Sequence, residues 1–404
     1  MTYDRFGLAP LLTAAENAAP VDSVEVVARD VRDRFGARSV SFLFVDIVGQ
    51  ELVRLLGHGT GFGPGGRGAE RIPLHGSVYD EVLRTQQVRR AEDGAGAERV
   101  IAPVTNRGDS IGVLEMTLPE ADDDVLGQIA ETAHALAYVL VTDRRFTDLY
   151  QWGQRTTPLS LAAEIQYQLL PTASCCEAAE FTLAGALAPA DDISGDTYDY
   201  SLGRDRLHLS ITDCMGHDVG SSLLATLLVN AIRGGRRAGY GIVGQAREAQ
   251  QALLDHAHGA LATGQLVSIS LDGSGAQVVN AGHPWPLRLR DGTVEEVPLA
   301  SGLPFGVDTP APPEAQPLDL RPGDRLVLYT DGMQEREAAT VDLRGLLWES
   351  RDEHPREVVR HLTGAVHEAS HDHLQDDATV LCLDWYGRSP GGRRRTAGGA
   401  DLPA

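Results

Sequence analysis

The chain has little of what would place it outside the cytosol. Its 404 residues contain four cysteines, none in the CxxC spacing of a zinc site, and Cys175 and Cys176 are too close together to bond to one another. No run approaches the roughly 20 apolar residues of a membrane span, and the N-terminus lacks the basic and apolar segments of a secretory signal. We therefore expect a cytoplasmic, reduced protein with no membrane partner.

Positive charge is scarce as well. The chain has 35 Lys and Arg residues against 57 Asp and Glu residues, a formal net charge of −22. Such a surface repels nucleic-acid backbones and anionic membranes, so both are poor partners. The apolar content of 42% is that of a folded protein, and the length predicts two or three domains.

Residues 1–120 have the pattern of a small α/β unit. The apolar spacing predicts helices and strands in the following order: a helix over 24–35, strands over 39–48 and 51–56, a helix over 77–84, and a hairpin of strands 100–104 and 111–118. In order and character these elements resemble a GAF domain, which would make this an N-terminal sensor with a small-molecule ligand. Five apolar residues either line a sensor cavity or form the core: Phe42, Phe44, Val53, Leu55 and Met116.

Residues 121–171 are predicted to be helical. Asp122 and its two acidic neighbours fit a helix N-terminus. Pro158 interrupts the pattern, and Thr157 before it fits an N-cap for a second helix that ends near Pro171. The pattern leaves two interpretations open: a linker packed on a neighbouring domain, or regulatory switch helices that dimerise the chain and transmit a signal.

Residues 172–387 alternate strand and helix patterns. Successive strands follow one another as hairpins with helices grouped between them, which indicates an α+β fold rather than a βαβ repeat. The small, polar and basic composition of residues 388–404 is typical of a disordered tail.

Four acidic motifs lie at the edges of strand-like runs in this part of the chain. They are Ile193-Ser194-Gly195-Asp196, Ile211-Thr212-Asp213-Cys214-Met215-Gly216-His217, Leu328-Tyr329-Thr330-Asp331-Gly332 and Asp376-Asp377-Ala378-Thr379-Val380. A single Asp before Gly is more often a turn cap. Four of them would repel one another unless cations intervene, and oxygen ligands suit Mg²⁺ or Mn²⁺ rather than zinc. The sequence therefore predicts one shared centre of two metal ions.

The same residues carry a family resemblance. Six motifs occur in order: Ser194-Gly195-Asp196-x-Tyr198-Asp199, Asp213-x-Met215-Gly216-His217, Asn280-Ala281-Gly282-His283-Pro284, Gly302-Leu303-Pro304-x-Gly306, Tyr329-Thr330-Asp331-Gly332 and Asp376-Asp377-x-Thr379. Together they resemble the SpoIIE/RsbU-type branch of the PP2C-like (PPM) serine/threonine phosphatases, over about residues 160–385. This resemblance implies a sandwich of two antiparallel sheets flanked by helices, with a two-metal site at one edge.

The resemblance also implies roles for individual residues. Asp213 would bridge both metals, and the Cys214 carbonyl would bind one of them. Asp331 and Asp376 would complete the shell of the second metal, with Asp377 beside it. Asp213 and Asp331 are therefore the principal catalytic candidates.

Other positions are assigned less directly. Asp196 would hold a metal or its water, and His283 is a candidate on the substrate side or at an accessory metal. His217 is a candidate general acid, although a histidine in a glycine turn is more often structural. Ser194 and Asp218 stand where the family commonly has glycine, and Asp218 would add negative charge near the metals.

The function implied by the resemblance is metal-dependent hydrolysis of phosphoserine or phosphothreonine by a water that two metals activate. The expected substrate is a phosphorylated STAS-type anti-anti-sigma protein, with the N-terminal unit regulating activity through the helices. An alternative is a non-catalytic module that uses the same fold to sequester a signalling partner.

Overall fold

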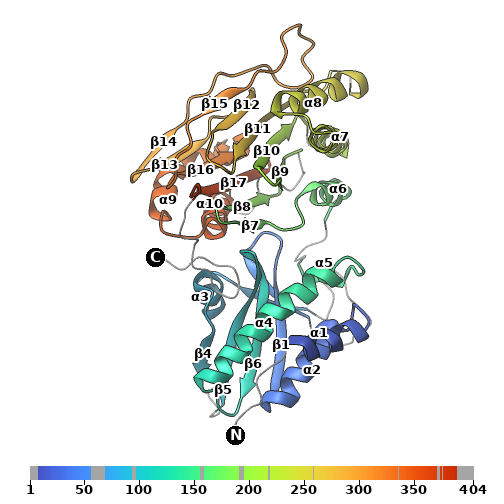
Figure 1. Cartoon of the computed structure of the whole chain (residues 1–404), viewed down its shortest axis with the longest axis vertical. Helices are drawn as coiled ribbons and strands as arrows, with labels where there is room; N and C mark the ends of the chain where they lie inside the picture. Colours follow the sequence, from blue (N-terminus) through green and yellow to red (C-terminus); the bar gives the residue numbers. More distant parts are fainter. Residues whose placement is uncertain are drawn as a thin grey trace. The chain divides into compact units, whose positions relative to one another are not determined.

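The chain forms two compact units, one centred on residues 1–158 and one on residues 159–392 (Figure 1). The computed structural model describes residues 8–55, 69–92, 97–154, 159–190, 195–216, 219–257, 259–334, 336–370, 374 and 376–388.

The N-terminal unit is built on one six-stranded antiparallel sheet in the order β3-β2-β1-β6-β5-β4. Its elements are α1 (Leu8–Asn17), α2 (Ser23–Phe35), β1 (Ser39–Val45), β2 (Glu51–Leu55), β3 (Ala69–Pro73), α3 (Val78–Thr85), β4 (Arg89–Glu92), β5 (Glu98–Asn106), β6 (Asp109–Leu118), α4 (Asp123–Asp143) and α5 (Leu149–Gly153). The two helices, two strands and hairpin that the sequence predicts for residues 24–118 are all present. The hairpin turns at Arg107 and Gly108, both with positive φ, as a two-residue turn requires.

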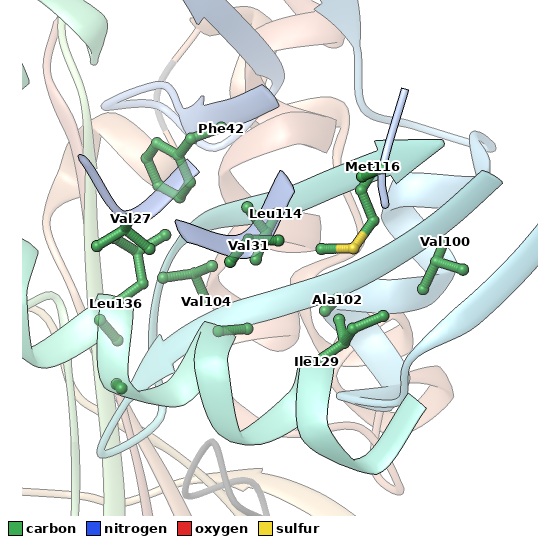
Figure 2. Packing of buried hydrophobic residues seen from close by; sticks show 14 of the residues in the cluster. Val27, Val31, Phe42, Val100, Ala102, Val104, Leu114, Met116, Ile129 and Leu136 are labelled. Atoms are coloured by element: carbon green, nitrogen blue, oxygen red, sulfur yellow. The ribbon is translucent and has the colours of Figure 1, made fainter. Parts of the chain in front are cut away.

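Both faces of this sheet are covered. Helices α2 and α4 contribute Val27, Val31, Ile129 and Leu136 to a core on one face (Figure 2). Helix α1 adds Leu11 to the same core. Helix α3 packs on the other face. Phe42, Phe44 and Met116 lie in the packed core of the first face, so core packing accounts for these three of the five candidate cavity residues.

The predicted linker over residues 121–171 is divided between the two units. Helix α4 packs into the N-terminal core because it is apolar on most sides. By length and composition α4 could also cross a membrane, but 56% of its most apolar window is buried in the protein. Helix α6 (Leu161–Leu169) belongs to the C-terminal unit. It begins after Ser160, whose hydroxyl accepts a hydrogen bond from Ala163 N, and not at Pro158 as predicted; residues 155–158 are outside the described residues.

The C-terminal unit contains two antiparallel sheets, in the orders β15-β12-β11-β10-β9 and β14-β13-β16-β17-β8-β7. After α6, its elements are β7 (Cys175–Glu177), β8 (Phe181–Ala188), β9 (Thr197–Leu202), β10 (Arg206–Cys214), α7 (Val219–Arg237), α8 (Ile242–His256), β11 (Ala262–Ser270), β12 (Ala276–Ala281), β13 (Leu287–Arg290), β14 (Thr293–Glu296), β15 (Gln316–Leu318), β16 (Arg325–Tyr329), the 3₁₀ turns η1 (Asp331–Met333) and η2 (Arg336–Thr340), α9 (Leu343–Glu349), α10 (Pro355–Ala369) and β17 (Ala378–Trp385).

The two sheets face each other across a shared apolar core, and helices cover their outer faces. Alternate residues of β17 serve both sides: Leu381 and Leu383 face the core between the sheets, while Val380 and Cys382 pack toward α10. Helices α7 and α8 cover the five-stranded sheet, and α9 and α10 the six-stranded sheet (Figure 1). The predicted sandwich of two antiparallel sheets flanked by helices is confirmed.

Candidate active site

The strand register carries the four acidic motifs to corresponding ends of the two sheets. In the five-stranded sheet, Thr197 at the start of β9 pairs with Thr212 near the end of β10. In the six-stranded sheet, Tyr329 at the end of β16 pairs with Val380 near the start of β17. Asp196 and Asp213 therefore lie at one end of the five-stranded sheet, and Asp331 and Asp377 lie at the corresponding end of the six-stranded sheet.

Hydrogen bonds then join the motifs across the two sheets. The hydroxyl of Thr330 donates to Asp196 Oδ2 at 2.6 Å and accepts from Thr379 N at 3.0 Å. The hydroxyls of Thr197 and Thr212 lie 2.6 Å apart. A single edge, which we call the acidic edge, thus holds all four motifs.

Two glycines allow this close approach. A Cβ at Gly195 would lie 2.7 Å from both Cβ and the carbonyl oxygen of Cys214, and a Cβ at Gly332 would overlap the carbonyl oxygen of Asp377. Any side chain at these positions would push Asp196 away from β10, or Asp331 away from β17. The glycines are needed for space here, because neither has a positive φ.

Asp196 shows the electrostatic consequence of this crowding. Burial raises the pKa of its carboxyl well above the usual range, and the negative charges of Asp213 and Asp377 raise it further. The hydrogen bond from Thr330 opposes this shift only in part. The acidic edge therefore holds more negative charge than its own hydrogen-bond donors stabilise.

Asp377 is held inside the protein. Its carboxylate accepts hydrogen bonds from Gln166 Nε2 at 2.6 Å and from Ala190 N at 2.9 Å. Gln166 Nε2 also donates to the carbonyl of Asp196 at 2.6 Å, so one buried side chain of α6 ties two of the motifs together. None of the acidic motifs in the sequence predicts this role of Gln166. Gln166 lies four residues after Ala162 and three residues before Leu169, so the helical repeat puts this polar residue on the apolar face of the helix. A polar residue at such a position is the sequence signal that could have indicated its role.

Asp199, although only three residues after Asp196 in the sequence, does not join this centre. Its buried carboxylate forms ion pairs with Arg233 at 2.8 Å and Arg236 at 3.1 Å, both from α7. Arg233 also donates to the carbonyl of Leu169 at 2.6 Å. The two arginines thus balance the charge of Asp199, and Arg233 also links α7 to the end of α6.

His283 is buried beside the strand that carries Asp213. Its Nδ1 lies 2.9 Å from the hydroxyl of Thr263, which is the cross-strand partner of Asp213. The side chain of Asn280 accepts from His283 N at 2.9 Å and donates to its carbonyl at 3.2 Å. Burial lowers the pKa of the imidazole to about 4, so it is neutral at physiological pH. This placement favours a supporting role over contact with a substrate.

The cysteine at the acidic edge is not a nucleophile. The Cys214 thiol is fully buried, and burial together with the charges of Asp213 and Asp196 raises its pKa well above the usual range. Its carbonyl oxygen faces Gly195 and the start of the first motif. This leaves the backbone carbonyl as the part of Cys214 that can serve as a ligand.

The donor chemistry of the acidic edge suits hard cations. Asp213, Asp331 and Asp376 are partly exposed, whereas Asp196 and Asp377 are buried, and carboxylate and carbonyl oxygens are the ligands of Mg²⁺ and Mn²⁺. Within the described residues, no group of three or more His, Cys, Asp or Glu side chains is placed to hold a metal ion. Several positions of the motifs lie outside the described residues: Asp191, Asp192, Ser194, His217 and Asp218.

Comparison with known proteins covers most of the C-terminal unit. Residues 203–386 match the family model of Stage II sporulation protein E (SpoIIE). Phosphoserine phosphatase RsbP of Bacillus subtilis (strain 168) is 25% identical over 206 residues, which are 48% of this chain and 50% of that protein. The chain thus spans about half the length of this curated relative.

Solved structures show a distant likeness. The SiaA-PP2C domain of Pseudomonas aeruginosa is 20% identical with a TM-score of 0.46, covering 56% of this chain and 94% of that one. The PP2C phosphatase domain of SpoIIE from Bacillus subtilis, with a fragment of its regulatory domain, is 15% identical with a TM-score of 0.44, covering 76% and 86%. The family match lies within the C-terminal unit, and three of the four acidic motifs fall inside the matched residues.

Proposed function

We propose that the chain is a metal-dependent protein serine/threonine phosphatase. The observation that carries this proposal is the convergence of four carboxylate motifs at one edge, where Asp213 and Asp377 raise the pKa of buried Asp196. Bound cations would stabilise negative charge that the protein's own groups leave uncompensated. The name of the relative RsbP, a phosphoserine phosphatase, supports the same reaction.

Five residues would hold two divalent cations, Mn²⁺ or Mg²⁺. Asp213 would bridge them, the Cys214 carbonyl would bind one, and Asp331 and Asp376 the other, with Asp196 holding a cation or its water. Bound there, the pair would lower the pKa of a water and neutralise the phosphoryl group that this water attacks.

Neighbouring groups orient these ligands. Thr330 fixes one oxygen of Asp196, and Asp377 N donates to Asp376 Oδ1 at 2.9 Å. Asp377, already bound by Gln166 and Ala190, positions Asp376 and is not itself open to solvent. His217 stays a candidate general acid, and its position is outside the described residues.

The substrate we propose is a phosphorylated regulatory protein of the STAS type, an anti-anti-sigma factor, in the cytoplasm. The support is the resemblance of the motifs to the SpoIIE/RsbU branch together with the similarity to RsbP. An acidic chain of net charge −22 makes nucleic acid an unsuitable partner.

We further propose that the N-terminal unit is a GAF-like sensor, with a small-molecule ligand, that acts through α6 as a switch. The support is the contact of α6 with the acidic edge: Gln166 hydrogen-bonds both Asp377 and the Asp196 carbonyl. A shift of α6 would release both bonds and loosen two of the four motifs. A homodimer through the central helices is part of this proposal, because α4 leaves Tyr138 exposed.

The test is hydrolysis of p-nitrophenyl phosphate and of a phosphorylated STAS-type protein by the full chain with Mn²⁺. We expect activity that chelator abolishes and that Asp213→Asn lowers by at least about 100-fold, in the range found when a group stabilising transition-state charge is removed. Asp255→Asn on the exposed surface of α8 is the matched control and should keep full activity. Activity that survives both chelator and Asp213→Asn would contradict the proposal.

A further inference from the structure

Three large apolar side chains are exposed at the same edge as the acidic motifs. Met215 is 61% exposed, Leu303 56% and Trp285 42%. We call these three residues the apolar rim. Single exposed apolar residues are common on protein surfaces, so their placement and surroundings decide whether they have a role.

The backbone places all three beside the site. Met215 directly follows Cys214, and its N–H donates to the carbonyl of Leu261 at 3.0 Å. Leu303 lies in a loop that is tied to the end of β12, because Gly302 N donates to Asn280 O at 2.8 Å.

Trp285 belongs to the same edge through the other sheet. It lies two residues before Leu287, which pairs with Val327 in antiparallel register, so Trp285 is at the end of β13 that faces the end of β16 leading to Asp331. Its indole N–H donates to the carbonyl of Leu299 at 3.0 Å, which fixes the ring over the segment that leads to Leu303. The apolar rim therefore borders the acidic edge on both sheets.

The segments that form the rim are free of formal charge. Residues 214–216, 260–265, 280–287 and 297–307 contain no Lys, Arg, Asp or Glu, in a chain in which 23% of residues are charged. The buried centres of protein–protein interfaces are depleted in charged residues and enriched in Met and aromatic residues. The composition of this border is thus that of a protein-binding surface.

We propose that the apolar rim is the docking surface for a folded phosphoprotein substrate, which presents a weakly charged, apolar surface around its phosphorylated residue. This proposal rests on the proposed phosphatase function. The side chains of phosphoserine and phosphothreonine are short, so a phosphoryl group that reaches the acidic edge brings the surface around it against Met215, Trp285 and Leu303. A second copy of the chain is the other candidate occupant, and the oligomeric state of the rim variants tests it below.

The experiment compares a folded substrate with small ones. Full-length protein with Mn²⁺ is assayed on a phosphorylated STAS-type protein, on a short phosphopeptide from its phosphorylation site, and on p-nitrophenyl phosphate. For Leu303→Ser and Trp285→Ser, we compare kcat/KM on the phosphoprotein with kcat/KM on p-nitrophenyl phosphate. We expect the ratio of the first to the second to fall about tenfold, because KM for the phosphoprotein rises. A tenfold change is typical when a residue that contributes substantially to an interface is lost. The wild-type preference for the folded protein over the phosphopeptide should shrink with it.

Leu202→Ser is the matched control. Leu202 is 45% exposed and lies at the opposite end of β9 from Thr197, away from the acidic edge. Its ratio should equal that of the wild type. Raising the salt concentration should not weaken docking in the wild type, because apolar contacts are not screened.

The outcomes separate this proposal from the one it rests on. If the wild type fails to hydrolyse p-nitrophenyl phosphate, the phosphatase function itself is wrong. If the wild type is active and both rim variants keep the wild-type ratio, the docking surface is wrong and the phosphatase function stands. Light scattering that shows a dimer in the wild type and a monomer in Leu303→Ser would also overturn the docking proposal, because the rim would then join two copies of the chain.

Discussion

Among the carboxylates of the acidic edge, Asp196 has the least favourable electrostatic environment. It is fully buried, hydrogen-bonded to Thr330, and faces the charges of Asp213 and Asp377. A carboxyl whose pKa is higher in the folded state than in the unfolded chain lowers the free energy of unfolding as the pH rises above its pKa in the unfolded chain. In the absence of cations, Asp196 should therefore weaken the C-terminal unit at neutral pH.

This gives a prediction for Asp196→Asn. In the presence of chelator at pH 8, we expect the variant to melt at a higher temperature than the wild type, because a buried charge is removed while Thr330 keeps an oxygen acceptor. Phosphatase activity should fall by about 10- to 100-fold, as when a metal-supporting group is lost. Thermal unfolding and p-nitrophenyl phosphate hydrolysis measure the two effects, and a lower melting temperature in chelator would contradict the electrostatic account.

Gly332 tests the packing of the same edge. Because a Cβ there would overlap the carbonyl oxygen of Asp377, Gly332→Ala should lower the free energy of unfolding by about 1–3 kcal/mol, as overpacking does. The control is Gly234→Ala in α7, where a Cβ meets no atom within 4 Å. That change should raise stability by about 0.5–1 kcal/mol through helix propensity. Equal stabilities of the two variants in urea unfolding would contradict this packing.

Asp46 gives a pH prediction for the N-terminal unit. Burial raises the pKa of its carboxyl to about 6, against hydrogen bonds from Gln50 N and Glu51 N that lower it. The folded form thus binds the proton more tightly than the unfolded chain, so stability is full below about pH 4 and falls as the pH rises to about 6. By pH 7.5 the loss is on the order of 3 kcal/mol.

The matching variant is Asp46→Asn, which keeps an oxygen acceptor for both backbone N–H groups. We expect slower amide hydrogen exchange in residues 39–55 at pH 7.5 than in the wild type, once intrinsic exchange rates are taken into account, and a flatter dependence of stability on pH between 4 and 6. Faster exchange in the variant at pH 7.5 would show that the charged carboxylate stabilises the turn.

At the scale of elements, helix α6 links the acidic edge to the rest of the chain through Gln166. Gln166→Ala would leave a buried oxygen of Asp377 and the Asp196 carbonyl without this donor. The Mn²⁺ concentration that gives half-maximal hydrolysis of p-nitrophenyl phosphate should rise about 10- to 100-fold, the usual effect of losing a group that orients ligands. Gln168→Ala, exposed on the same helix, should behave as wild type; if both variants keep the wild-type Mn²⁺ dependence, α6 does not support the centre.

The elements show what the sequence could predict. The apolar, β-branched residues of β17 are typical of a buried strand, and the apolar residues of α10 recur at helical spacing, so local pattern indicates both elements. The Ala and Gly residues of β8 have low strand propensity, so this strand depends on its pairing with β17 and β7, which no local pattern indicates. The start of α6 was misplaced because Ser160 caps it, while Thr157-Pro158 offered a similar local signal.

At the scale of the whole molecule, the acidic edge could be predicted only in part. The motifs indicated that Asp196, Asp213, Asp331 and Asp376 share a centre, because each lies at a strand end. That Thr330 bonds Asp196, or that Gln166 bonds Asp377, depends on how two sheets and a helix pack on one another, and no local pattern carries that information. Likewise, Asp199 does not contribute to the centre because it pairs with arginines of α7 that lie more than 30 residues away in the sequence.

The central claim is that these aspartates form one two-cation centre, and direct Mn²⁺ binding to the full chain tests it most closely. Isothermal titration of the metal-free protein should give two Mn²⁺ per chain, with coupled spins in electron paramagnetic resonance, and Asp213→Asn should lose both the second ion and the coupling while Asp255→Asn keeps them. Wild-type protein that binds no Mn²⁺, or Asp213→Asn protein that binds two coupled ions, would contradict the account.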